Sequence, residues 1–236
     1  MAAANRTMSG FAKRVRVSES ANLSEKVKYR SFCLIVIDCL RADELLPYGA
    51  NEAFFGGLTF RNCFAASGWT LPSMASILTG HFPAEHGLHN HYCQIKVPTK
   101  AEIFRDAGFY TAAVVNNNNL DPAFGFANGF SSYTYLKNEQ HDDVFELAPQ
   151  HLKEAAERRS FVLIHTNVVH DYGMDRPYYR DPEGKEPIPP VAHKPWITWP
   201  DQYHRVLRAR YRRGIRYCME RIRSEVLPHL DLSSTL

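Results

Sequence analysis

The chain contains 236 residues, of which 44% are apolar and 22% are charged, and its formal net charge is +3. This length suits a single large α/β domain, and this composition is that of a folded globular protein. No run reaches the roughly 18 consecutive apolar residues that a membrane-spanning helix requires, and the net charge is too small to favour nucleic acid. We therefore expect neither a membrane nor a nucleic-acid partner, and the sequence does not predict the oligomeric state.

The first 30 residues are predicted to form a flexible tail ahead of one domain, residues 31–236. The opening sequence, MAAANRTMSGFAKRVRVSES, has basic residues but lacks the apolar segment of a secretory signal, and a transit peptide is the alternative to a disordered tail. The five cysteines are odd in number and show no paired metal spacing. Reduced thiols in a cytoplasmic protein are therefore expected.

The first predicted element is a strand in the segment FCLIVIDCLRAD, residues 32–43, whose apolar run ends at Asp38. Its β-branched and apolar residues predict a buried strand. A carboxylate at the carboxyl end of a strand in an open α/β sheet lies where such folds bind ligands. Asp38 is thus a candidate metal ligand, and the alternative is that it caps a turn.

The next predicted element is a helix in WTLPSMASILTGHFPAEHGLHNH, residues 69–91. Pro72 suits the first turn of a helix, so Thr70 is expected near its N-cap. The unpaired backbone N–H groups and the positive end of the helix dipole would lie beside the Thr70 hydroxyl. A phosphate or sulfate oxyanion binds at such a place, although a simple capping role for Thr70 explains the same pattern.

The rest of the chain alternates helices and strands, which predicts a mostly parallel sheet covered by helices on both faces. Thr99 and Glu102 form a capping box, and Gly108 ends the helix that follows. The further predicted elements are a strand at 110–115, a helix at 142–159, a strand at 161–167 and a helix at 201–227.

Two segments near the end of the chain have unusual compositions. Residues 181–200 hold several prolines and two tryptophans without periodicity, and we expect a long surface loop near the mouth of a site. The region 205–223 contains eight arginines. They predict either a nucleic-acid patch or a solvated helix face that packs through its apolar residues, and the modest overall charge favours the second.

Several of these segments resemble the sulfatase branch of the alkaline phosphatase superfamily, from about Phe32 to the end of the chain. The resemblance implies an alkaline-phosphatase-like α/β fold, with Asp38 as a metal ligand, Thr70 as a metal-bound nucleophile, and His170 in contact with the substrate or leaving group. The segments that carry it are IVIDCLRADELLPYG, TFRNCFAASGWTLPSMASILTGHFPAEHG, AEIFRDAGFYTAAVVNNNNL, GFANGF and FVLIHTNVVHDY.

The chain also departs from the family pattern. Sulfatases carry Cys or Ser in Cys-x-Pro-Ser-Arg and oxidise it to formylglycine, whereas Thr70 cannot give that aldehyde and Met74 replaces the arginine. Phosphoryl-transferring relatives use an unmodified threonine. The family usually has a lysine or histidine where this chain reads VVNNNNL, so Asn116 is the candidate substrate-binding residue there.

The resemblance leaves the metal site short of ligands. Asp38 and Thr70 supply too few donors for a divalent ion, since calcium takes about six oxygens and zinc about four ligands. His86 is expected to support its loop, and His89 with His91 forms a His-x-His pair that lacks a third ligand nearby. Because family members add an Asp-His or Asp-Asn pair after a later strand, we expect the domain to be incomplete at Leu236.

Two functions follow from the resemblance and its gaps. The first is a metal-dependent hydrolase of small anionic sulfuric or phosphoric esters, with Thr70 as nucleophile and Ca²⁺, Mn²⁺ or Zn²⁺ as cofactor. The second is a catalytically silent binding or interaction protein that keeps the fold without a complete metal site.

Overall fold

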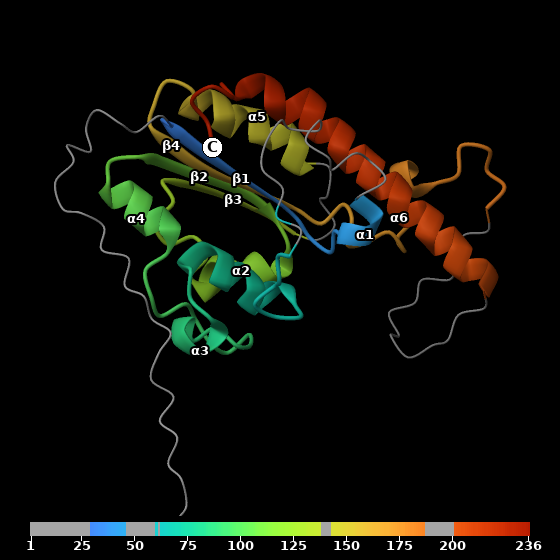
Figure 1. The fold of residues 1–236 in the computed structure, drawn as a ribbon, viewed down its shortest axis with the longest axis horizontal. Helices are drawn as coiled ribbons and strands as arrows, with labels where there is room; N and C mark the ends of the chain where they lie inside the picture. Colours follow the sequence, from blue (N-terminus) through green and yellow to red (C-terminus); the bar gives the residue numbers. More distant parts are fainter. Residues whose placement is uncertain (1–28, 46–59, 61, 138–142, 187–200) are drawn as a thin grey trace, which may run out of the picture.

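The computed structural model describes residues 29–45, 60, 62–137, 143–186 and 201–236. Its centre is one sheet of four parallel strands in the order β1-β4-β2-β3 (Figure 1). The strands are β1 (Ser31–Ile37), β2 (Tyr110–Asn116), β3 (Ser132–Leu136) and β4 (Ser160–Thr166). The expected α/β fold with a parallel sheet is therefore confirmed.

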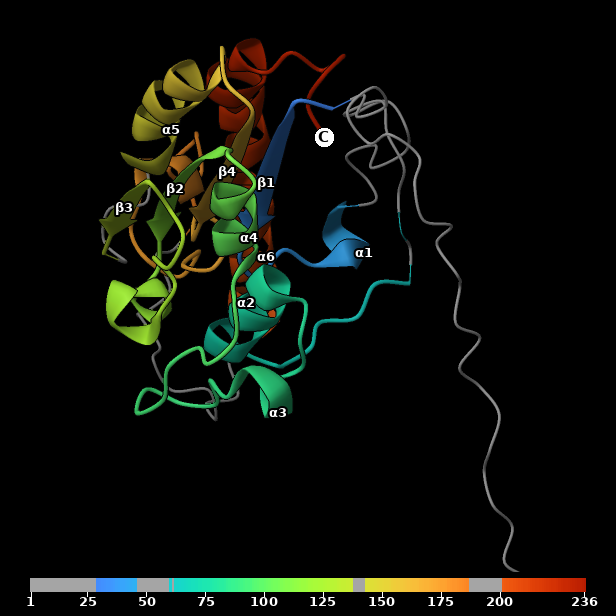
Figure 2. The same ribbon diagram turned by 90° about the vertical axis from the view of Figure 1, so that its left-hand side faces the viewer.

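Helices cover both faces of this sheet, as predicted (Figures 1 and 2). α5 (Asp143–Ala155) and α6 (Asp201–Arg221) pack on one face, and α2 (Thr70–Thr79) and α4 (Lys100–Asp106) pack on the other. Because strand side chains alternate between faces, β4 directs Ile164 to the α5 side and Leu163 to the α2 side. Each strand thus contributes to two separate apolar cores.

Shorter helical segments connect the main elements. These are α1 (Ala42–Leu45), α3 (Pro83–His86), the 3₁₀ segments Asn118–Leu120, Pro122–Phe124, Pro177–Tyr179 and Leu227–His229, and the π-helical turn Ile222–Val226. The capping box of Thr99 and Glu102 is confirmed at the start of α4. The predicted helix at 201–227 corresponds to α6, which ends at Arg221, and to the π-helical turn that follows it. β3 has no counterpart among the predicted elements.

β1 differs from its prediction in one respect. The sequence predicts a buried strand, but β1 is only half-buried. Among the described strands, only β4 pairs with β1, so β1 lies at the edge of the sheet. Ser234–Leu236 lie against the start of its other edge in parallel, where Cys33 N donates to Leu236 O over 2.8 Å and Leu236 N donates to Ser31 O over 2.9 Å. β4, paired on both sides, is buried throughout.

Two predicted segments fall largely outside the described residues. The tail predicted for residues 1–30 lies outside them up to residue 28, and the loop predicted for 181–200 does so from residue 187. Within the described part of the chain, no helix has the combination of length and apolar character that crossing a membrane requires.

Candidate functional site

The carboxyl ends of three adjacent strands bring polar side chains together. Asp38 follows β1, Asn117 follows β2, and His165 and Asn167 lie at the end of β4. Asp38, Asn117 and His165 each come two positions after an apolar residue of the core beneath α2. Since strand side chains alternate, this spacing directs the cluster to the α2 face of the sheet.

Thr70 joins this cluster from the opposite side, as the first residue of α2. Its Oγ1 donates to Asp38 Oδ2 over 2.9 Å. α2 is held on the sheet by Leu71, Met74 and Leu78, all of which are buried. The predicted position of Thr70 at a helix start is therefore confirmed, and the helix N-terminus faces the strand ends.

One oxygen of Asp38 is the centre of the cluster. Asn117 Nδ2 donates to Asp38 Oδ2 over 2.9 Å, beside the bond from Thr70. Asn117 Nδ2 also donates to Asn167 Oδ1 over 2.9 Å, which holds the Asn117 amide beside this carboxylate. A carboxylate that accepts several hydrogen bonds has a fixed orientation. Asp38 is thus a preorganised acceptor next to the Thr70 hydroxyl.

His165 is a buried imidazole beside this carboxylate. Its Nε2 lies 3.6 Å from Asp38 Oδ2, and within the described residues neither ring nitrogen has a hydrogen-bond partner. Burial lowers the pKa of His165 to about 4, against the opposing effect of the Asp38 charge. The ring is therefore neutral at pH 7, with one nitrogen lone pair available.

His170 follows β4 and is the more exposed histidine of the site. Its Nδ1 lies 2.7 Å from Asp171 Oδ1, and its side chain is 40% exposed. The hydrogen bond to Asp171 raises the pKa of His170 despite partial burial, and the charge of Asp38 adds to the rise. His170 therefore holds a proton to higher pH than an ordinary histidine.

A cavity of about 830 Å³ lies between the turn after β1, which lines it through Cys39, the loop after β4 and α6. Polar groups and apolar side chains both contribute to its walls. Its polar lining includes His170, His204 and Arg208, and its apolar lining includes Leu40, Leu207 and Tyr172. A cavity of this size and mixed lining suits a small organic molecule.

Known proteins resemble this chain in sequence and in fold. The sequence model of the sulfatase family matches residues 41–220. The chain belongs to the sulfatase family. The matched part of this sulfatase-family chain contains Thr70 and His170 and begins three residues after Asp38. No curated protein sequence matches the chain significantly.

Solved structures share the fold of this sulfatase-family chain. One is BT4656 in complex with its substrate D-glucosamine-2-N,6-O-disulfate, with a TM-score of 0.53 and 20% identity over 63% of this chain and 36% of that one. A protein described as a sulfatase, from Bacteroides thetaiotaomicron, has a TM-score of 0.58 and 16% identity over 87% of this chain and 56% of that one. A Vibrio parahaemolyticus member of the alkaline phosphatase superfamily has a TM-score of 0.53 and 17% identity over 88% of this chain and 53% of that one. The chain thus spans about a third to just over half of the length of these structures, and the expected alkaline-phosphatase-like fold is confirmed.

The structure separates the two neighbouring asparagines of VVNNNNL. Asn116 is fully buried, and its Nδ2 donates to the carbonyl of Lys137, away from Asp38. Its predicted substrate contact stays a prediction, whereas Asn117 is the asparagine that contacts Asp38. Sequence reasoning missed Asn117, His165 and Asn167 as site residues. The alternation of faces along β2 and β4 is the signal that identifies them.

The other histidines considered from the sequence lie apart from Asp38. His86 is fully buried, with Nε2 3.1 Å from Ser76 Oγ and Nδ1 accepting from Leu88 N over 3.1 Å, which is a structural arrangement. His91 Nε2 contacts Asn119 Oδ1 at 2.8 Å. Across the described ranges, no three His, Cys, Asp or Glu side chains gather closely enough to hold a metal ion.

The same finding limits the number of ligands that the described residues could offer a divalent metal ion. With one ligand atom from each residue, Asp38 and Thr70 would supply two oxygens, and His165 would add one unpartnered nitrogen 3.6 Å from Asp38. These groups fall short of the roughly four ligands of zinc and six of calcium. The described residues therefore do not form a complete divalent-metal site by themselves.

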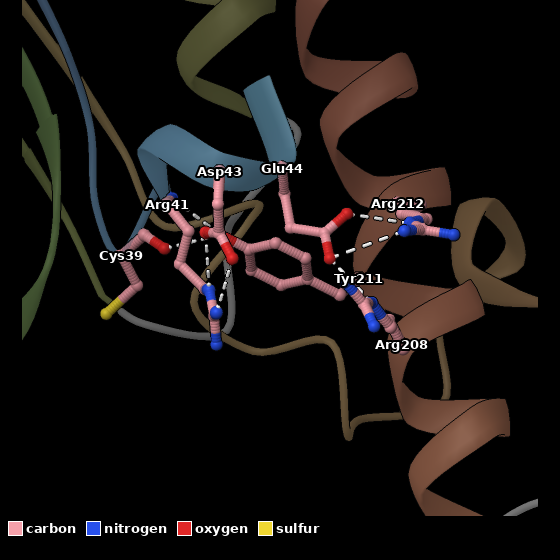
Figure 3. Close-up of polar contacts among 7 residues, drawn as sticks. All are labelled: Cys39, Arg41, Asp43, Glu44, Arg208, Tyr211 and Arg212. Atoms are coloured by element: carbon pink, nitrogen blue, oxygen red, sulfur yellow. Dashed lines mark hydrogen bonds and ion pairs between the residues drawn. The ribbon is translucent and has the colours of Figure 1, made fainter. Parts of the chain in front are cut away.

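Most arginines of α6 make contacts within the molecule. Arg208 Nε and Arg212 Nε donate to the carboxylate of Glu44, over 2.6 and 2.7 Å (Figure 3). Arg210 is buried and donates to the carbonyls of Tyr172 and Met174. These contacts favour the packed helix face over the nucleic-acid patch as the reason for the arginine-rich sequence.

Proposed function

We propose that this sulfatase-family chain carries the nucleophile of a hydrolase of small anionic sulfate or phosphate esters. The observation that supports this most directly is the hydrogen bond from Thr70 Oγ1 to Asp38 Oδ2, at 2.9 Å. A hydroxyl becomes a useful nucleophile when an adjacent base accepts its proton. The carboxylate is already oriented by Asn117, so the pair needs little rearrangement before reaction.

The proposed step forms a bond from Thr70 Oγ1 to phosphorus or sulfur and breaks the bond to the alcohol oxygen. The Thr70 proton passes to Asp38, and the departing alcohol oxygen takes a proton from His170. Backbone N–H groups at the start of α2 stabilise the negative charge on the equatorial oxygens. Water then attacks phosphorus or sulfur and breaks its bond to Thr70 Oγ1, which takes its proton back from Asp38, while His170 regains a proton from the water.

The cavity between the turn after β1, the loop after β4 and α6 is the proposed site for the organic part of the ester. His170 is both a lining residue and the proposed proton donor, which links the cavity to the reacting oxygen. The protonated form of His170 favours an anionic ligand, since Asp171 raises its pKa. Small anionic esters therefore agree with both the size and the polarity of the cavity.

Dependence on Ca²⁺, Mn²⁺ or Zn²⁺ belongs to the same proposal and is supported by family membership. Such an ion, when bound, would polarise the ester oxygens. We expect turnover to stop after treatment with EDTA and to return with one of the three ions. Turnover that survives EDTA would contradict the metal requirement without affecting the role of Thr70.

The test of the nucleophile compares Thr70→Val with Thr70→Ser on p-nitrophenyl phosphate and p-nitrophenyl sulfate. Valine keeps the shape of threonine without the hydroxyl, and serine keeps the hydroxyl. We expect the valine variant to lose about 10³-fold or more in kcat and the serine variant to retain turnover. Equal turnover in the wild type and the valine variant would exclude Thr70 as the nucleophile.

The second candidate is a catalytically silent binding protein, which one observation favours. Met74, at the position of the motif arginine, is 2% exposed and packs in the core beneath α2. It therefore offers no charge to the site. This candidate predicts no turnover of either ester, together with thermal stabilisation by an ester that is the same in the wild type and Thr70→Val.

A further inference from the structure

The turn that carries Asp38 has an unfavourable backbone conformation. Cys39 has φ 59° and is the only non-glycine residue with positive φ in the described part of the chain. A residue with a Cβ atom disfavours this left-handed region and keeps it only when surrounding contacts hold it there. Because Cys39 directly follows Asp38, its conformation sets where the chain leaves the carboxylate.

A side chain far along the sequence makes these contacts. Tyr211 of α6 donates its hydroxyl to Cys39 O over 2.7 Å and accepts from Arg41 N over 2.8 Å (Figure 3). One hydroxyl thus bridges a carbonyl and an amide two residues apart. On the other side of the turn, Asp38 N donates to Thr166 O over 3.0 Å. The turn is therefore held between β4 and α6.

α1 strengthens the attachment of this turn to α6. Glu44 is 3% exposed and accepts from Arg208 and Arg212, which lie on α6 on either side of Tyr211 in the sequence (Figure 3). The Tyr211 ring packs edge-to-face on Tyr172 with centroids 5.2 Å apart. These contacts fix both the ring and the segment that follows the turn, so the Tyr211 hydroxyl has a defined place.

We propose that Tyr211 is a positioning residue that fixes the Asp38 carboxylate toward Thr70 by holding Cys39 in its left-handed conformation. Its catalytic consequence rests on the proposed function, whereas the placement of Asp38 does not. Without the hydroxyl, Cys39 relaxes toward ordinary backbone conformations and Asp38 leaves its hydrogen bonds with Thr70 and Asn117. A glycine at position 39 accepts positive φ without penalty and removes the need for Tyr211.

The test is a double-mutant cycle of Tyr211→Phe and Cys39→Gly, read by NMR. The side-chain NH₂ of Asn117 donates to Asp38 Oδ2, so its resonance reports the position of the carboxylate. The exchange rate of the Arg41 amide reports the bond to Tyr211. Tyr110→Phe is the matched control, because it removes a hydroxyl that bonds to Glu154 at the opposite end of the sheet.

We expect Tyr211→Phe to shift the Asn117 side-chain resonance and to speed Arg41 exchange about tenfold, the effect of removing hydrogen bonds of ordinary strength. Adding Cys39→Gly should return the Asn117 resonance toward the wild-type position, and Tyr110→Phe should leave it unchanged. An unmoved Asn117 resonance in Tyr211→Phe would overturn the proposal, as would a shift that Cys39→Gly does not reduce.

Turnover of p-nitrophenyl phosphate and p-nitrophenyl sulfate provides the second measurement. If the wild type hydrolyses either ester, we expect about a tenfold lower kcat in Tyr211→Phe and its partial recovery in the double variant. A loss of kcat that Cys39→Gly leaves unchanged would contradict the positioning role. If the wild type hydrolyses neither ester, the proposed function fails, and the NMR result still decides whether Tyr211 places Asp38.

Discussion

On the α2 side of the sheet, the site is made of side chains that the strands and the helix deliver directly. Asp38, Asn117 and Thr70 meet through hydrogen bonds of 2.9 Å between their own side chains. On the α6 side, the site is made of two backbone segments that side chains of α6 hold in place, one about 170 residues earlier in the chain and the other fewer than 40. Tyr211 binds the turn after β1, and Arg210 binds the loop after β4.

This difference separates chemistry from support. The α2 side provides the groups that can react, and they satisfy one another over short distances. The α6 side contributes few reacting groups but determines where two loops lie, since carbonyls and amides of these loops have their partners on α6. Changes on the α6 side should therefore act through stability and the positions of the two loops, whereas changes on the α2 side should act directly on the groups around Asp38.

The largest expected loss of stability comes from Arg210→Met. Arg210 is 2% exposed, and its guanidinium donates to the carbonyls of Tyr172 and Met174, which would lose these partners inside the protein. We expect the free energy of unfolding to fall by about 3 kcal/mol in urea titrations. The exposed Arg216→Met is the control and should change it by about 0.5 kcal/mol or less. Equal effects of the two substitutions would contradict the supporting role of Arg210.

The buried His165 on the α2 side should make the free energy of unfolding depend on pH. Below its ordinary pKa of 6.5, His165 binds a proton in the unfolded chain, whereas the folded protein resists it down to about pH 4. Stability should therefore fall as the pH decreases from 6.5 to 4, by as much as about 3 kcal/mol. His165→Leu should flatten this part of the pH profile of unfolding. A profile that keeps its slope in the variant would show that His165 is not the group responsible.

The two neighbouring asparagines allow a matched comparison of activity. Asn117→Ala removes a donor to Asp38, and we expect about a tenfold fall in kcat for p-nitrophenyl phosphate or sulfate. Asn116→Ala removes a bond to the Lys137 carbonyl and should lower stability more than kcat. The reverse order of the two kcat values would favour Asn116 as the substrate-binding residue.

The smallest effect on stability is expected where Glu44 of α1 meets the exposed arginines of α6. Glu44→Gln weakens the contacts to Arg208 and Arg212, whose side chains are 60% and 43% exposed. Because solvent screens such pairs, we expect a loss of about 1 kcal/mol in the free energy of unfolding, smaller at high salt. A salt-independent loss would instead indicate that packing of α1 is the main contribution of Glu44.

Local patterns in the sequence were sufficient for much of the fold. The apolar runs gave β1, β2 and β4, and the capping residues gave the start of α4. β3, with the sequence SYTYL, was missed because its aromatic and hydroxyl residues show no apolar run. The edge position of β1 was also missed, since an apolar sequence does not indicate how many neighbours a strand has.

Residue chemistry and spacing identified Asp38 and Thr70 as candidate site residues, because Asp38 lies at the end of a strand and Thr70 at the start of a helix, whereas His170 came from the resemblance to sulfatases. Only the tertiary structure showed that Asn117 and His165 surround the same carboxylate, and that Asn116 points elsewhere. The bridge from Tyr211 to Cys39 had no sequence signal at all. Its partners are backbone atoms, whose positions depend on how a helix and a turn pack across the whole chain.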